Sequence, residues 1–252
     1  MYNDYFVFNQ TIVLTAAAPL FTYQHKMRSD YYLFDFSGAT TAAIGVNVLL
    51  DITNVTQNRK LMSDPCRAGL CAVPQPGDSS YLHPVLLREN DVIEIQATLN
   101  VGAPNVTFDL SMLGFNHAGG VPEFCAEPKE LYFYVFDFGN FTALQRLVVT
   151  KQIVKNKDFI GLGWVATTNA SALNTIEYRI RNSSSGDNWM SQDVPGATLF
   201  PNFAANMRRV RFRLPQLLRS EEILTIEAQD VTAGVVTDVA VAIYGYHQAR
   251  GL

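Results

Sequence analysis

The side chains that most often carry out enzyme chemistry form no recognised catalytic pattern in this 252-residue sequence. It contains no G-x-S-x-G, H-E-x-x-H or C-x-x-C motif and no glycine-rich phosphate loop. Its four histidines and three cysteines are scattered, and no acidic cluster of the kind that binds calcium is present. We therefore expect a protein that is not an enzyme and that binds no cofactor.

A metal site is the next chemistry to weigh. Cys66, Cys71, His83 and Cys125 would supply the ligands of a Cys₃His zinc site, but their spacing is irregular for one. The sequence therefore favours no bound metal. For Cys66 and Cys71 two outcomes stay open, a disulfide in an oxidising setting or two reduced thiols in a loop.

The densest charge lies in the stretch MRRVRFRL, residues 207–214. Alternation along a strand would gather Arg209, Arg211 and Arg213 on one face. Three interpretations follow: a solvated face with local acidic partners, a subunit contact that accepts carboxylates from a neighbouring chain, and a contact with packaged nucleic acid. We take the subunit contact as the functional prediction. The apolar residues that alternate with the arginines would then face inward: Val210, Phe212 and Leu214.

Composition limits the classes of function. Hydrophobic residues make up 48% of the chain and charged residues 17%, so we expect other subunits to cover part of the surface. The net charge of −4 gives no global basic field for nucleic-acid binding. No apolar run reaches 18 residues, which predicts no membrane span. The N-terminal stretch lacks a basic region, and we expect no signal peptide there.

One 15-residue segment occurs twice in similar form, and it is called the repeated phrase below. YLHPVLLRENDVIEI begins at Tyr81 and FRLPQLLRSEEILTI begins at Phe212, a shift of 131 residues. Over the 40 positions from Tyr81 to Gly120 nine residues are identical, and upstream a shift of 128 aligns further pairs such as Asn54 with Asn182. One collinear series of this length predicts a tandem duplication.

Within each copy, apolar and polar residues alternate with the period of a half-buried strand. Gly114 and Gly245 are predicted to follow two of these strands, at a bulge or turn that needs a residue without Cβ. The strands that precede them should place these residues in the two cores: Val106, Phe108, Leu110 and Met112, with Val239, Val241 and Ile243.

Seven or eight strands in each copy predict an all-β protein of two tandem antiparallel jelly-roll-like sandwiches, related by internal duplication. The first sandwich should span 1–118, a linker rich in glycine and proline 119–131, and the second sandwich 132–252. One helical turn is expected at 203–208. Besides the repeated phrase, the strand candidates are 5–14, 31–36, 45–53, 132–138, 146–151, 159–166, 174–181 and 207–214.

Two tandem eight-stranded sandwiches without an enzyme motif resemble the double jelly-roll capsid proteins of icosahedral viruses. The segments Pro84 to Ile95 and Pro215 to Ile226 look like an inter-strand turn of such virion proteins. The resemblance implies a non-enzymatic virion or bacteriophage structural protein that forms a homo-oligomer, with a trimer favoured, and that contacts other virion proteins. It leaves open a capsid, decoration or tail role.

The alternative is a carbohydrate-binding or receptor-binding sandwich, since lectin-like modules share this architecture. Trp189, in the loop SSSGDNWMSQD, would be the residue that stacks on a glycan. Trp164 lies in an alternating segment and is assigned to the core. An enzyme built on a double sandwich is the third class to be tested.

Overall fold

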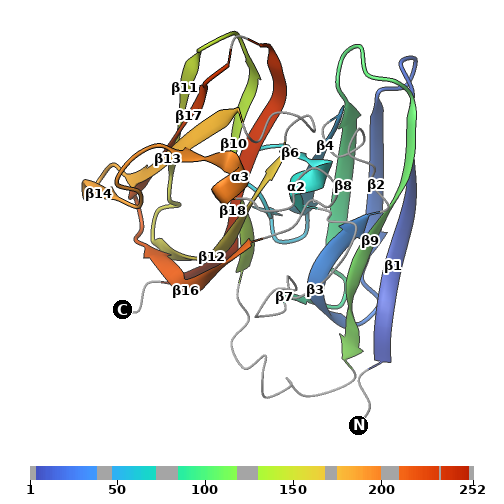
Figure 1. Ribbon diagram of the computed structural model, residues 1–252. Helices are drawn as coiled ribbons and strands as arrows, with labels where there is room; N and C mark the ends of the chain where they lie inside the picture. Colours follow the sequence, from blue (N-terminus) through green and yellow to red (C-terminus); the bar gives the residue numbers. More distant parts are fainter. Residues whose placement is uncertain are drawn as a thin grey trace. The chain divides into compact units, whose positions relative to one another are not determined.

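The computed structural model describes residues 4–38, 47–71, 85–117, 130–167, 175–199, 210–232 and 234–249. The chain divides into two compact units, Met1–Tyr132 and Phe133–Leu252. Each unit consists of antiparallel strands in two sheets (Figure 1). No helix in these residues is long and apolar enough to cross a membrane.

The first unit builds one sheet of order β1-β9-β3-β7 and a second of order β2-β8-β4-β5, with β6 also paired to β4. Every neighbouring pair is antiparallel, and chain neighbours such as β1 and β2 lie in different sheets. The elements are β1 (Asp4–Leu14), β2 (Leu20–Lys26), β3 (Asp30–Gly38), β4 (Val48–Asn54), β5 (Arg59–Lys60), β6 (Cys66–Arg67), α2 (Ala68–Cys71), β7 (Val85–Leu87), β8 (Val92–Leu99) and β9 (Val106–His117).

The second unit has sheets of order β10-β18-β12-β16 and β11-β17-β13-β14, with β15 also paired to β13. The strand β10 begins two residues before the predicted start of the second sandwich. The elements are β10 (Glu130–Phe141), β11 (Arg146–Gln152), β12 (Lys157–Thr167), β13 (Ile176–Asn182), β14 (Asp187–Asn188), β15 (Val194–Pro195), α3 (Gly196–Leu199), β16 (Val210–Leu218), β17 (Ile223–Asp230) and β18 (Val236–Ala249).

The two units share one topology. Replacing β1 to β9 by β10 to β18 in the same order converts the sheets of the first unit into those of the second, and a four-residue helix follows the sixth strand in each. This confirms an all-β protein of antiparallel, sandwich-like sheets. Descent of the units from a duplicated ancestor stays a prediction from the sequence, as do the domain bounds.

The cores lie where the alternation predicted them. The alternating residues of β9 from Val106 to Met112 are buried, and so are Val239, Val241 and Ile243 of β18. The strand β18 is more deeply enclosed than expected, since Ala240, Ala242 and Tyr244 on its other face are buried too.

The list of predicted strands omitted one strand that the structure contains. The strand β2 was not among the candidates, and its residues alternate between exposed and half-buried with none fully buried. The repeat contained the missing signal, since the shift of 128 aligns Thr22 and Gln24 with Thr150 and Gln152 of β11. The helical turn predicted at 203–208 lies outside the described residues.

The repeated phrase forms the corner at which the chain passes from one sheet to the other. In the first unit this corner joins β7 to β8, and Asp91 lies in it with 4% of its surface exposed. One oxygen of Asp91, Oδ2, accepts hydrogen bonds from the backbone N–H of Arg88 at 3.0 Å and from Asn54 Nδ2 at 2.9 Å. The N–H of Glu89 donates to Asp30 Oδ1 at 2.8 Å. The corner is therefore tied to the ends of β3 and β4.

The second unit repeats these bonds between β16 and β17. Glu222 Oε2 accepts the N–H of Arg219 at 2.8 Å and Asn182 Nδ2 at 2.9 Å, and the N–H of Ser220 donates to Asp158 Oδ1 at 2.8 Å. Each of these residues is the partner that the two sequence shifts assign. The phrase recurs in the sequence because the same corner is built twice.

Gly114 and Gly245 lie inside β9 and β18, and neither ends its strand as predicted. Gly114 is opposite Leu33 and Gly245 is opposite Gly161, and in both ladders the register shifts directly after that pair. A Cβ on Gly245 would collide with the carbonyl oxygen of Ile160, and one on Gly114 would collide with that of Tyr32. A bulge therefore does require a glycine at these two positions.

We predict that Gly245→Ala destabilises the protein by about 1–3 kcal/mol or more, because the new methyl group has to displace backbone atoms. Gly161→Ala is the matched control, since the nearest atom to its Cβ would be 3.4 Å away, an ordinary contact. Urea unfolding of both variants tests this. Equal losses of stability would show that the close approach at Gly245 is not what constrains the bulge.

We also predict that Asp91→Ala lowers the free energy of unfolding by about 1–3 kcal/mol, because it leaves the buried Asn54 amide without its acceptor. Glu89→Ala is the control. Glu89 lies two residues before Asp91 in the same turn, its side chain is exposed, and only its backbone N–H forms the hydrogen bond to Asp30. Thermal and urea unfolding measure both. A loss for Glu89→Ala as large as that for Asp91→Ala would contradict the role of the carboxylate.

Candidate functional site

The predicted basic strand is an edge strand. Within the described residues β16 is paired with β12 and has no neighbour on its other side. Arg211 lies in β16 opposite Gly163, and Arg213 lies two residues further along the strand. Arg209 falls outside the described residues. An edge strand presents unpaired backbone groups, which suits pairing with another chain, and charged residues on it restrict which partner can pair.

The face assigned to Leu214 was incorrect. Phe212 is half-buried as predicted, whereas Leu214 is 74% exposed and Leu217 is 56% exposed. Between Gly161 and Gly163 the register of β16 shifts by several residues, so the strand loops away from β12 there. Strict alternation does not survive such a bulge. The outcome is an edge strand that carries exposed leucines as well as arginines.

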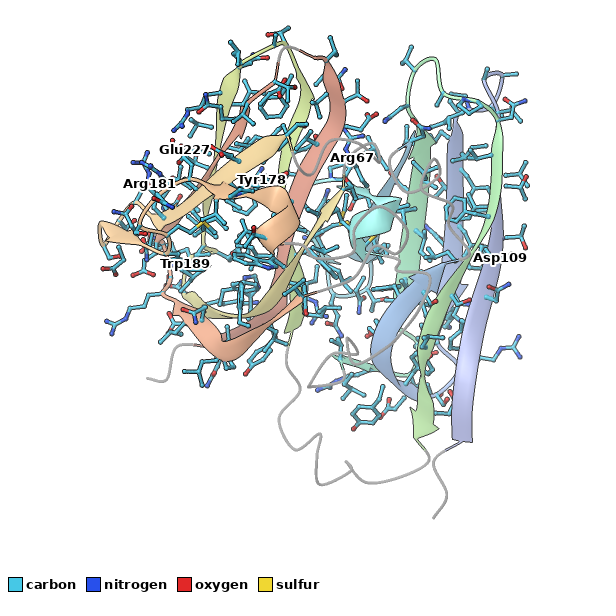
Figure 2. The ribbon with its side chains drawn as sticks, in the orientation of Figure 1. Arg67, Asp109, Tyr178, Arg181, Trp189 and Glu227 are labelled. Atoms are coloured by element: carbon cyan, nitrogen blue, oxygen red, sulfur yellow. The ribbon has the colours of Figure 1, made fainter. Side chains whose placement is uncertain are left out.

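Trp189 packs against the inner side of this strand. Its ring meets Phe212 edge-on at a centroid distance of 6.0 Å, and Phe212 meets Trp164 edge-on at 5.0 Å. Both tryptophans are half-buried, so Trp164 is less enclosed than predicted. Figure 2 labels Trp189 on the segment that follows β14. The three rings connect the two sheets of the second unit, and the role of Trp189 as a glycan contact stays a prediction.

An ion-pair network holds the segment that carries Trp189. Arg146 of β11 contacts Asp193 at 2.6 Å and Glu227 of β17 at 2.9 Å. Asp193 also contacts Arg179 of β13 at 2.8 Å. Glu227 contacts Arg181 at 3.0 Å, and Figure 2 labels both of these residues. The hydrogen bond to Asp193 is the main reason why the pKa of Arg146 is raised. No local sequence pattern indicated this network, because its members are scattered between Arg146 and Glu227.

Two of the four residues considered as zinc ligands, Cys66 and Cys71, lie within the described residues. Cys66 and Cys71 are buried thiols beside the carbonyl oxygen of Arg67, so the structure does not join them in a disulfide. His83 and Cys125 lie outside the described residues. Within the part of the chain that is described, no three histidine, cysteine or carboxylate side chains come together as metal ligands.

A cavity of about 530 Å³ lies inside the first unit, between β1 and β9 of one sheet and β2 and β8 of the other. His25 of β2 lines it, with the ring of Phe8 at a centroid distance of 4.1 Å and the hydroxyl of Tyr23 at 3.2 Å from Nδ1. Burial and the positive charge of Arg28 lower the pKa of His25 below its usual 6.5. The imidazole is therefore neutral at pH 7.

No protein-family model matches this sequence, and no curated protein matches it. The chain aligns with the extracellular domain of ANXUR2 from Arabidopsis thaliana over 96% of its own length and 84% of that chain, at 8% identity and a TM-score of 0.30. It aligns with a protein of Sulfolobus Turreted Icosahedral Virus over 96% and 60%, at 11% identity and a TM-score of 0.28.

The chain also aligns with the VP2 subviral particle of infectious bursal disease virus, over 97% of its own length and 72% of that chain, at 10% identity and a TM-score of 0.26. Two of these three proteins are components of viruses. TM-scores of this size carry no argument about function, so the proposal below rests on the strands and surfaces of this chain.

The lowered pKa of His25 predicts how the stability of the protein depends on pH. The unfolded chain binds a proton at His25 near pH 6.5, whereas the folded protein binds it only at lower pH. Acidification from about pH 7 through 6.5 therefore favours the unfolded state, and the contribution vanishes above that range. His25→Gln should flatten the fall in stability between pH 7 and 5, measured by urea unfolding. Parallel profiles for the two proteins would contradict the shift.

Proposed function

We propose that this protein is a non-enzymatic virion structural protein, a capsid or capsid-associated building block that assembles with copies of itself and with other virion proteins. A trimer is the oligomer we expect, and the virion is its location. The proposal is supported by a chain of two jelly-roll-like units with matching topology, which offers similar edges twice per subunit. Closed symmetric assemblies are built from such repeated edges.

The observation that carries the proposal is the edge strand β16. It combines an unpaired side within the described residues, the arginine positions 211 and 213, and two exposed leucines, Leu214 and Leu217. Isolated edge strands are normally short or shielded, since an open apolar edge invites association. A long edge with leucines and arginines suits a subunit contact in which the leucines are buried and the arginines select a partner that carries carboxylates.

The other interpretations of the arginines are less well supported. A solvated face does not account for the two leucines on the same strand. A nucleic-acid contact would rest on three arginines in a chain of net charge −4, a small electrostatic contribution. The carbohydrate-binding alternative would rest on Trp189, a half-buried ring that already packs edge-on with Phe212.

We predict that changing Arg209, Arg211 and Arg213 together to Glu prevents assembly and leaves the protein folded. The reversed charges would meet the carboxylates of the partner at close range, which costs several kcal/mol of association free energy. Light scattering measures the oligomer and circular dichroism measures the fold. Assembly of the wild type should also weaken at high salt, since exposed charge pairs are screened.

A matched control carries the same change in charge elsewhere. Lys26, Arg88 and Lys155 are exposed and lie outside β16, and changing all three to Glu should leave assembly intact. A monomeric wild-type protein would refute the assembly proposal itself. An oligomer that survives the change of Arg209, Arg211 and Arg213 would instead show that the contact lies on another edge.

A further inference from the structure

The cavity in the first unit goes beyond the proposed assembly, because it lies between the sheets of that unit, whereas β16 belongs to the second unit. Its volume of about 530 Å³ falls within the range of sites that bind small organic molecules. Both sheets contribute to it: β1 and β9 form one continuous ladder in the first sheet, and β2 and β8 form another in the second. The walls are therefore formed before any ligand arrives.

The inner wall is apolar and rich in rings. Phe8 of β1 lies beside Met112 of β9 in the ladder between these strands, and the buried side chains of Leu110 and Ile95 line the same cavity. The ring of Phe8 is held edge-on by Tyr31 at 5.0 Å. Aromatic rings and a methionine sulfur are favourable neighbours for another aromatic ring. This wall suits a flat ring better than a polar or strongly hydrated molecule.

Next to this apolar wall the cavity is lined by polar groups that form no bond with other described residues. His25 Nε2 is buried and has no hydrogen-bond partner among the described residues. Arg28 is exposed beside the cavity and forms no ion pair within the described part of the chain. A buried ring nitrogen without a partner is costly, which makes this position favourable for a ligand group that hydrogen-bonds to it.

We propose that this cavity binds a small aromatic carboxylate, with its ring against the wall formed by Phe8 and Met112 and its carboxylate toward Arg28 and His25. An arginine beside a half-enclosed site pairs well with a carboxylate, since its planar fork matches the two oxygens. The neutral His25 ring donates from Nε2 to the carboxylate when the other nitrogen accepts from Tyr23, at 3.2 Å. The net charge of the cavity, contributed by Arg28, selects an anion over a neutral analogue.

The test uses 2-naphthoate as the probe and 2-naphthylmethanol as its uncharged analogue of similar shape. Both are titrated into the full-length protein by calorimetry, and the binding position is followed by the NMR signals of the Phe8, Tyr23 and His25 rings. We expect 2-naphthoate to shift these ring signals and to bind at least fivefold more tightly than the alcohol, a ratio typical of one half-exposed charge pair (about 1 kcal/mol).

Arg28→Gln should reduce the affinity for 2-naphthoate roughly fivefold and leave that for the alcohol unchanged. Arg88→Gln is the matched control, because Arg88 is an exposed arginine of the same unit that does not line the cavity. Because both substitutions are at the surface, the variants should remain folded. Equal binding of acid and alcohol, equal affinity in wild type and Arg28→Gln, shifts confined to residues outside the cavity, or no binding at all would each overturn the proposal.

Discussion

The carboxylate of Asp91 ties together the corner of the first unit and the end of β4. It sits at the corner between the two sheets and accepts hydrogen bonds from the corner itself and from Asn54 at the end of β4. A third donor, Gln57 Nε2, lies 2.8 Å from the same oxygen. Because three donors converge on one buried acceptor, neither the turn nor the end of β4 can shift without leaving a polar group unsatisfied.

The register of both sheets depends on this corner. The strand β7 enters it from one sheet and β8 leaves it in the other, so a slip of one residue would turn every side chain of β8 to the wrong face. Glu222 does the same for the second unit with a longer side chain. The backbone conformation is also the same in the two corners, since Asn90 and Glu221 both adopt a left-handed conformation just before the acidic residue. The cost of that conformation in Glu221 is met by the bonds around it.

Local sequence patterns predicted the parts of this fold that depend on local physics. Alternation identified the buried faces of β9 and β18, and the repeated acid identified the corner. The pattern failed where packing depends on distant residues. The strand β2 was missed because its assignment needed comparison with β11, its distant counterpart in the repeat, and the exposure of Leu214 depends on a bulge opposite Gly161. For the candidate site, the sequence predicted only the strand that carries the arginines. It did not predict the ring cluster and the ion pairs, because these join residues that are far apart in the chain.

The ladder between β1 and β9 has a consequence for the order in which the polypeptide acquires its structure during synthesis. The first strand of the unit pairs along its whole length with the last, from Leu14 opposite Val106 to Asp4 opposite Asn116. The N-terminal segment, made first, must therefore wait for about a hundred further residues before its hydrogen bonds can close. Contacts of such long separation make folding slow, and the waiting edge is exposed to other nascent chains. The second unit repeats the delay with β10 and β18, so each half of the chain reaches its native topology only when its own last strand has left the ribosome.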